Sequence, residues 1–231
     1  MNLGTFRPAF LPDLTYFWQM AQCNVAVFTD HLPFSKGTSV NRSAVFPDAQ
    51  TILRVPILHN KNRKRIFETE IDYHSGWAAK HLKTLHHFFH NLPFAYYYLP
   101  ELEELFNTRF LSLGDFLFAL QQKLVRWLYL PVRMFRASQS EFDFSAEDLI
   151  DLWANRTHCR TYMSQAETFE KGWVKPKALQ EKGITPAIFT PIPNSHLLKN
   201  YRSAVILNFL LQFGPEAGFI IQQYLPPAKE A

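Results

Sequence analysis

The sequence predicts an α/β fold, a layered mixed sheet flanked by helices, with a helical segment around residues 75–128. Short apolar or alternating segments typical of strands recur along the chain, and segments with helical periodicity separate them. The hydrophobic fraction is 47% and the charged fraction 19%, a balance typical of a folded core. For 231 residues we expect a single domain over 1–231, with a helical subdomain or insertion at 75–128 as the open alternative.

The first seventy residues are predicted to contain one helix and several short strands. Asp13 can cap a helix that runs to about Gln22, because its carboxylate can accept hydrogen bonds from the first helical turn. Apolar or alternating residues then predict strands, and Pro47, Asp48 and Ala49 predict the turn between two of them. These strands are expected at 24–28, 43–46, 50–55 and 66–71.

The next segment, 75–128, has the periodicity of helices. Apolar residues at a 4-3-4-3 spacing predict a first helix, which Pro93 ends. A short helix is expected after Pro100. Ser112 and Asp115 resemble a capping box and predict the start of a longer third helix.

The last hundred residues return to alternating strands and helices. Strands are expected at 132–137, 160–164 and 186–189. Helices are expected at 145–154, 175–182 and 203–213, and from Pro215 onwards. Gly183 and Gly214 follow two of these helices, at the position where glycine commonly ends a helix. The sequence leaves open whether the strands pair in parallel throughout.

Composition argues against several classes of protein. Two cysteines, Cys23 and Cys159, are too few for a disulfide scaffold or a four-cysteine zinc site, and we expect both to be buried thiols. The glycine signatures G-x-G-x-x-G and G-x-x-x-x-G-K-[ST] are absent. No apolar segment reaches the roughly 18 residues of a membrane-spanning helix, and the first residues lack the features of a signal peptide. We therefore expect a cytoplasmic protein.

The net charge of +4 permits anionic partners without requiring them. One basic cluster occurs, at 61–65, and a solvated loop is its favoured interpretation. Nucleic-acid binding is therefore unlikely as the main function. A run of three tyrosines, Tyr96, Tyr97 and Tyr98, could stack on a sugar ring or a base, although packing on the protein surface is more common.

Polar residues gather after the predicted strand at 24–28. They are Asp30, His31, Lys36, Asn41 and Arg42. Ligands of α/β sheets bind beyond the carboxyl ends of strands, so this position suits a site. Asp30 or His31 could be a general base, while Lys36 and Arg42 could hold a phosphate or carboxylate. The alternative is turn chemistry, with Asp30 as a cap and Lys36 in an exposed loop.

Four histidines lie in the first helix of the 75–128 segment: His81, His86, His87 and His90. His86 and His90 share a helix face, as two zinc ligands would. No third ligand is evident, however, so a solvated face is favoured and no metal site is predicted. The sequence does not identify a cofactor.

A series of short segments, in a fixed order, resembles the WbqC-like protein family. The family opens with Q-P-x-x-F/L-P-x-x-G-Y-F, and residues 7–17 here are RPAFLPDLTYF. The later matches are a strand at 25–28, FSK at 34–36, NR at 41–42, LRVPI at 53–57, Trp77 with Lys80 and His81, PF at 93–94, and ILNFLLQFG at 206–214. The resemblance covers residues 6 to 218. Arg7, Thr15 and Asn208 stand where the family has glutamine, glycine and aspartate.

The resemblance implies a link to bacterial surface-polysaccharide synthesis rather than one particular reaction, because the family takes its name from genes in surface-polysaccharide clusters. It implies an intracellular transferase-like enzyme that acts on a small anionic sugar precursor or nucleotide-sugar. The residues expected to bind the substrate are Arg7, Lys36, Asn41, Arg42 and Lys80, and those expected to be catalytic are Asp30, His31 and His81. The departures from the family pattern put activity in this chain in question.

The alternative is a non-catalytic binding or assembly protein. Its contact surface would be the tyrosine run and the basic loop at 61–65. The departures at Arg7 and Asn208 favour this alternative. The sequence sets neither the substrate nor the oligomeric state.

Overall fold

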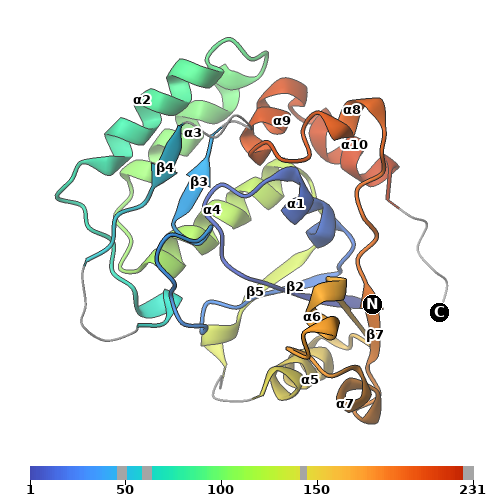
Figure 1. Ribbon diagram of the computed structural model, residues 1–231. Helices are drawn as coiled ribbons and strands as arrows, with labels where there is room; N and C mark the ends of the chain where they lie inside the picture. The colour runs from blue at the N-terminus through green and yellow to red at the C-terminus, as the bar shows by residue number, and fades with distance from the viewer. Residues whose placement is uncertain (46–50, 59–63, 141–144, 226–231) are drawn as a thin grey trace.

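The computed structural model describes residues 1–45, 51–58, 64–140 and 145–225. Its centre is a five-stranded parallel sheet in the order β5-β2-β1-β6-β7 (Figure 1). The strands are β1 (Asn2–Phe6), β2 (Val25–Phe28), β5 (Arg133–Arg136), β6 (Thr161–Ser164) and β7 (Thr185–Ile188). The central strand β1 therefore pairs with β2 on one side and with β6 on the other.

Helices cover both faces of this sheet, as the alternation of side chains along the strands requires. Leu3, Val25 and Val27 pack with α5 (Ala146–Thr157) and α7 (Pro176–Glu181). Phe6 and Phe28 point to the opposite face, which is covered by α1 (Leu14–Ala21), α4 (Leu113–Trp127), α9 (Ile206–Phe213) and α10 (Glu216–Gln223). Figure 1 shows α1 and α4 on one side of the sheet and α5 and α7 on the other. The arrangement is a doubly wound α/β sheet, and the predicted fold class is confirmed.

The parallel and antiparallel pairs lie in two separate sheets. The antiparallel pair is β3 (Arg42–Ala44) with β4 (Ile52–Arg54), and Figure 1 shows it beside α2 and α3. The turn predicted at residues 47–49 lies outside the described residues. Ser43 Oγ donates a hydrogen bond of 2.9 Å to Leu11 O, which ties this hairpin to the loop after β1.

The helical segment at 75–128 consists of α2 (Trp77–Phe89), α3 (Ala95–Asn107) and α4. The expectation of a short helix after Pro100 was wrong, because α3 begins at Ala95 and contains the proline. Ala95, Leu99 and Leu102 form a buried face, and burial of that face offsets the backbone hydrogen bond that a proline cannot make. The three helices pack into the same apolar cluster as α1 and Phe28. The single-domain expectation stays a prediction.

Two strand assignments from the sequence were wrong. The alternating segment 66–71 forms a short 3-10 helix, Ile66–Glu68, because Glu68 Oε2 accepts a hydrogen bond from Arg65 N at 2.8 Å. Conversely, the strand β1 was not predicted. Its Gly4 is a poor strand former, yet a Cβ there would lie 2.7 Å from Cys23 Sγ, so the close packing at this position requires glycine.

The predicted helix caps are confirmed at three positions. Asp13 Oδ1 accepts a hydrogen bond from Tyr16 N, and Ser112 Oγ and Ser145 Oγ accept from Asp115 N and Asp148 N, each at 3.1 Å. The short helices α6 (Ala166–Glu170) and α8 (His196–Lys199) were not predicted. Both are too short to show a clear apolar period.

Candidate functional site

The strand order reverses between β1 and β6, and this reversal creates a crevice at their carboxyl ends. The chain leaves β1 into α1 on one face of the sheet, and it leaves β6 into α6, whose Phe169 packs on the opposite face with α5. Doubly wound sheets bind ligands at such a switch point. The crevice is therefore the first place to look for a site.

A pocket of about 320 Å³ lies at this position. Thr15, Trp18 and Gln19 come from one face of α1, and Gln165 follows β6 directly. The remaining lining residues are Ala166, Ile188, Phe189, Thr190, Pro191, Ile192 and Arg202. We call this the switch-point pocket.

Hydrogen bonds between distant segments hold the pocket walls. Trp18 Nε1 donates to Thr190 O at 2.7 Å, and Gln22 Nε2 donates to the same oxygen at 3.0 Å. Thr190 N in turn donates to Gln22 Oε1 at 2.8 Å. Across the crevice, Gln165 Nε2 donates to Gln19 Oε1 at 3.2 Å. These bonds join the walls of the pocket to one another.

Arg202 gives the pocket a positive charge. Its Nη2 donates to Ile192 O at 3.0 Å, and Thr15 Oγ1 donates to Arg202 O at 3.2 Å. No carboxylate lines the pocket, and none within the described ranges forms an ion pair with Arg202. A guanidinium without a counter-charge beside a cavity favours an anionic ligand.

The amino end of α1 differs from the phosphate cradle of dinucleotide-binding sheets. Asp13 places a carboxylate on the first-turn amides, where a phosphate would otherwise bind. Burial raises the pKa of the Asp13 carboxyl, and hydrogen bonds from backbone N–H groups, Tyr16 first, lower it only in part. This helix end therefore already has a side-chain oxygen at its first-turn amides, unlike a phosphate cradle.

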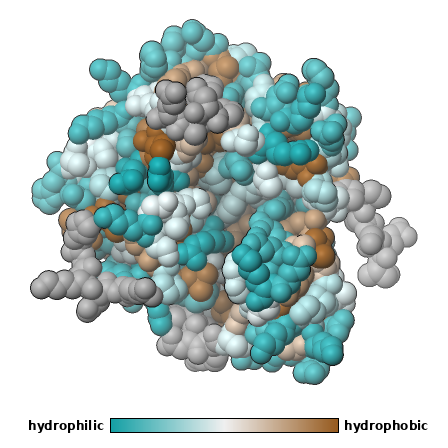
Figure 2. All heavy atoms as spheres, viewed as in Figure 1, coloured by the Kyte–Doolittle hydropathy of each residue, from teal (hydrophilic) through white to brown (hydrophobic). Residues whose placement is uncertain are grey.

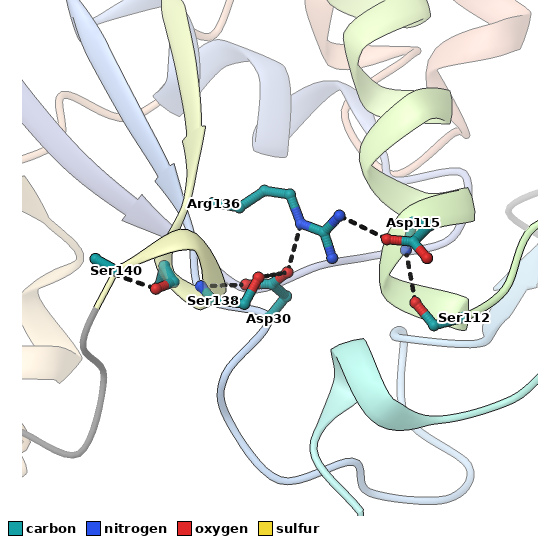
Figure 3. A network of polar contacts seen from close by, with 7 residues as sticks. Asp30, Ser112, Asp115, Arg136, Ser138 and Ser140 are labelled. Carbon is teal, nitrogen blue, oxygen red and sulfur yellow. Dashed lines mark hydrogen bonds and ion pairs between the residues drawn. The ribbon is translucent and has the colours of Figure 1, made fainter.

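A second polar cluster lies at the carboxyl ends of β2 and β5 (Figure 3). Asp30 is 0% exposed, and its carboxylate accepts three hydrogen bonds. Arg136 Nε and Ser138 Oγ donate to Oδ2 at 2.7 Å each, and Ser138 N donates to Oδ1 at 3.0 Å. These contacts give Asp30 a positioning role for β5. Its predicted role as a general base is tested by none of them and stays a prediction.

Arg136 lies between two carboxylates, as Figure 3 shows. Its Nη1 donates to Asp115 Oδ1 at 2.6 Å, in addition to the bond with Asp30. Burial on its own would lower the pKa of the Arg136 guanidinium, but the hydrogen bonds to Asp115 and Asp30 raise it. Because one cation pairs with both carboxylates, this cluster has the character of a structural tie.

The loop after β1 and the stretch around residue 40 do lie together. Arg7 Nη2 donates to Pro33 O at 2.9 Å, and Phe10 N donates to Ser39 O at 2.8 Å. His31 is half-buried directly after Asp30, whereas Lys36 is exposed. The structure therefore brings Arg7 to the segment that precedes Lys36, and the proposed roles of both side chains stay predictions.

Asn41, Arg42 and His81 converge on β4. Asn41 is 2% exposed and its Nδ2 donates to Val55 O at 2.9 Å. Arg42 lies opposite Arg54 in the ladder. His81 Nε2 lies 3.1 Å from Arg54 N and 2.9 Å from Arg54 O. Burial lowers the pKa of His81, and the hydrogen bond with Arg54 opposes this in part. Lys80 is exposed beside it.

None of the predicted site residues lines the switch-point pocket. Sequence reasoning missed Gln19, Gln165 and Arg202, which form the polar part of its lining. The position of Gln165 directly after a strand was a usable signal. Its importance depends on β1 being the central strand, which was not recognised.

The described residues contain no group of three or more His, Cys, Asp or Glu side chains that could hold a metal ion. His90 Nδ1 lies 3.0 Å from His86 O, so one of the two spaced histidines contacts the helix backbone. Cys23 and Cys159 are buried and unlinked, and burial raises the pKa of the Cys23 thiol. Within the same residues, no helix has the length and apolar character needed to cross a membrane.

The basic cluster at 61–65 lies mostly outside the described residues. Of its members, Lys64 forms an ion pair of 2.6 Å with Glu70. Its charge is therefore at least partly compensated within the protein.

A family model described as the WbqC-like protein family matches residues 7–217. The chain belongs to the WbqC-like protein family. The resemblance inferred from the ordered motifs is thus confirmed. No curated protein and no solved structure matches the chain. The match begins directly after β1 and ends in the first turn of α10, so both the switch-point pocket and the Asp30 cluster lie within the matched residues.

Proposed function

We propose that the protein is a cytoplasmic transferase-like enzyme whose small anionic substrate binds in the switch-point pocket. The observation that carries this proposal is the position of Arg202, which is a cation without a carboxylate partner among the described residues and lines a pocket at the reversal of strand order. In this arrangement Arg202 binds the anionic group of the substrate.

The size and lining of the pocket support a compact substrate. A volume of about 320 Å³ is near the lower end for small-molecule sites, so it suits a phosphorylated or carboxylated sugar better than a whole nucleotide-sugar. Trp18 and Phe189 supply apolar surface, while the amides of Gln19 and Gln165 can hydrogen-bond hydroxyl groups. Membership of the WbqC-like family supports a link to surface-polysaccharide synthesis by association.

The roles proposed for the other residues are secondary. Arg7 follows β1 at the same edge of the sheet and would attract anions towards the crevice. Of the proposed bases, Asp30 and His31 follow β2 at this same edge of the sheet. The proposed roles of Lys36, Asn41, Arg42, Lys80, Asp30 and His81 in substrate binding or catalysis stay predictions.

A non-catalytic binding protein is the second candidate, and one observation favours it. Arg202 is the only ionisable side chain in the described lining of the pocket, so no general base lines it. The exposed-aromatic version of this candidate rests on Tyr96 and Tyr97, which are 67% and 57% exposed. On the face that Figure 2 shows, the apolar patches are small and are separated by polar residues.

Binding is tested by thermal shift against sugar phosphates, sugar acids and nucleotide-sugars. A ligand at 100 times its dissociation constant stabilises the natural protein by about 2.7 kcal/mol. This stabilisation is expected to be lost in Arg202→Met and kept in Arg160→Met, a matched exposed arginine outside the pocket. If Arg202→Met binds the ligand as tightly as the natural protein does, the switch-point pocket is not the binding site.

Turnover separates the two candidates. The ligand found by thermal shift is incubated with the protein and with donor or acceptor sugars, and products are followed by mass spectrometry. New products that disappear with Arg202→Met support the enzyme. Unchanged ligand, with binding still dependent on Arg202, supports the binding protein.

A further inference from the structure

Two arginines lie directly opposite each other on the β3–β4 hairpin. The register pairs Arg42 with Arg54. Val55 N donates to Asn41 O at 2.9 Å and Val45 N to Thr51 O at 3.0 Å, which marks the hydrogen-bonded positions of the ladder. Arg42 and Arg54 therefore form a non-hydrogen-bonded pair, the kind in which opposite side chains come closest, with Cα atoms about 4.5 Å apart.

Both arginine side chains are on the outer face of the hairpin. The intervening residues Ser43 and Leu53 are buried, so side chains at the neighbouring positions point away from the core. Arg54 is exposed and Arg42 is half-buried. Like charges directly opposite each other destabilise a sheet, so the pair costs folding free energy when no anion is present.

The hairpin is held so that this repulsion cannot be relieved by a shift in register. Asn41 Nδ2 bonds to Val55 O, and Ser43 Oγ bonds to Leu11 O. On the outer edge of β4, His81 Nε2 contacts both N and O of Arg54. Three side chains, two from the hairpin itself and one from α2, thus fix a ladder of only three residue pairs.

Nearby acidic residues do not neutralise the pair. The segment that follows β4 packs against residues 68–72, through Leu58 N to Glu70 O and Asp72 N to Pro56 O, each at 3.0 Å. The carboxylates of Glu70 and Asp72 have other partners: Glu70 pairs with Lys64, and Asp72 pairs with His74. Among the described residues, no carboxylate forms an ion pair with either arginine.

We propose that Arg42 and Arg54 form a clamp for a phosphate group. Two planar guanidinium forks on adjacent strands can each bind a tetrahedral oxyanion in a bidentate manner, and a dianion offsets both charges. Lys80 precedes His81 on α2 and is exposed. The clamp shares no residue with the switch-point pocket, so it extends beyond the proposed function.

The clamp is tested by titrating the whole protein with inorganic phosphate and following the arginine Nε–Hε signals by NMR at constant ionic strength. The signals of Arg42 and Arg54 are expected to move together, with one common dissociation constant. Arg42→Gln and Arg54→Gln are each expected to weaken phosphate binding at this position by tenfold or more. Arg54→Lys keeps the charge without the fork and is expected to weaken it less.

Two controls make the result specific. Arg160→Gln removes an exposed arginine just before β6 and is expected to leave the titration unchanged. Arg202→Met is expected to abolish binding in the switch-point pocket without affecting the clamp, so the two proposals can fail separately. Without phosphate, Arg54→Gln is expected to raise the melting temperature slightly, because it removes the repulsion.

The proposal is overturned if phosphate leaves the Arg42 and Arg54 signals unmoved. It is also overturned if either glutamine variant binds phosphate at the hairpin as the natural protein does, or if chloride at equal ionic strength moves the same signals equally.

Discussion

The carboxyl edge of the sheet contains two polar regions that balance their charges in opposite ways. At the ends of β2 and β5, the buried Asp30 receives two bonds from Ser138 and one from Arg136, which also binds Asp115. At the crevice beside β1, Asp13 accepts only backbone N–H groups, and Arg202 donates only to backbone carbonyls. In the first region the cation and both carboxylates are paired with one another, whereas in the second Arg202 lines a cavity and has no carboxylate partner among the described residues. The first arrangement is that of a structural tie, and the second is the observation on which the proposed binding site rests.

The largest effect is expected from Asp30→Ala in the matched region. The variant leaves Arg136, whose side chain is 13% exposed, with Asp115 as its one remaining carboxylate, which is itself 35% exposed. Breaking one side of a buried ion pair costs about 3–5 kcal/mol of the free energy of unfolding. Urea denaturation measures this loss. A loss below about 1 kcal/mol would mean that the cluster is solvated, and the contrast with the crevice would disappear.

A smaller effect is expected from Gln22→Ala, behind the pocket wall. The variant removes both hydrogen bonds between Gln22 and Thr190. Thr190 O keeps its bond from Trp18, so the loss in the free energy of unfolding is about 1 kcal/mol. Ligand affinity in the switch-point pocket is expected to fall as well, since the wall loosens. Calorimetric titration measures this affinity, and an affinity equal to that of the natural protein would contradict the prediction.

Asp13, at the crevice, is also expected to make stability depend on pH. Burial raises the pKa of Asp13 above its usual value of 3.8, so its contribution to stability is fully present below pH 3.8 and is lost as pH rises through the raised pKa. Asp13→Asn keeps a good helix cap and does not titrate, so the variant avoids the loss of stability that occurs as pH rises. The variant is expected to be at least as stable as the natural protein at pH 7, with an advantage that shrinks towards pH 3. Urea midpoints across this range measure the difference, and an advantage that grows on acidification would reverse the assigned sign.

The smallest effect on stability is expected from Arg202→Met. Its guanidinium is exposed and has no carboxylate partner in the described structure, so the free energy of unfolding should change by less than about 0.5 kcal/mol. Binding in the pocket, in contrast, should be lost. If the free energy of unfolding of Arg202→Met falls by several kcal/mol, Arg202 has a structural role rather than a binding role.

Features set by local sequence were predicted well. The caps at Asp13, Ser112 and Ser145 depend on bonds to residues three positions away, so the sequence window contains all that is needed. The apolar stripe of α2 was recognisable for the same reason. Pro100 was misjudged, because the buried face that keeps α3 continuous is a property of its packing.

Features set by distant partners could not be predicted. Asp30 was correctly marked as an unusual polar residue at a strand end. However, Arg136 and Ser138, which engage its carboxylate, lie 106 and 108 positions further along the chain. The pocket likewise combines α1 with Gln165 and Arg202, and no local pattern connects them. The family resemblance supplied the order of the motifs but no geometry.

The pairing of β1 also has a consequence for how the chain acquires its structure during synthesis. β2 follows β1 within the first 28 residues, but the other neighbour of β1 is completed only at Ser164. At about 5–20 residues per second, a ribosome needs roughly 8–30 s to add the roughly 160 residues from the end of β1 to the end of β6. Throughout that time one edge of the innermost strand has unsatisfied amide and carbonyl groups. A nascent chain halted before Thr161 is therefore expected to require a chaperone or to associate with other chains through this edge.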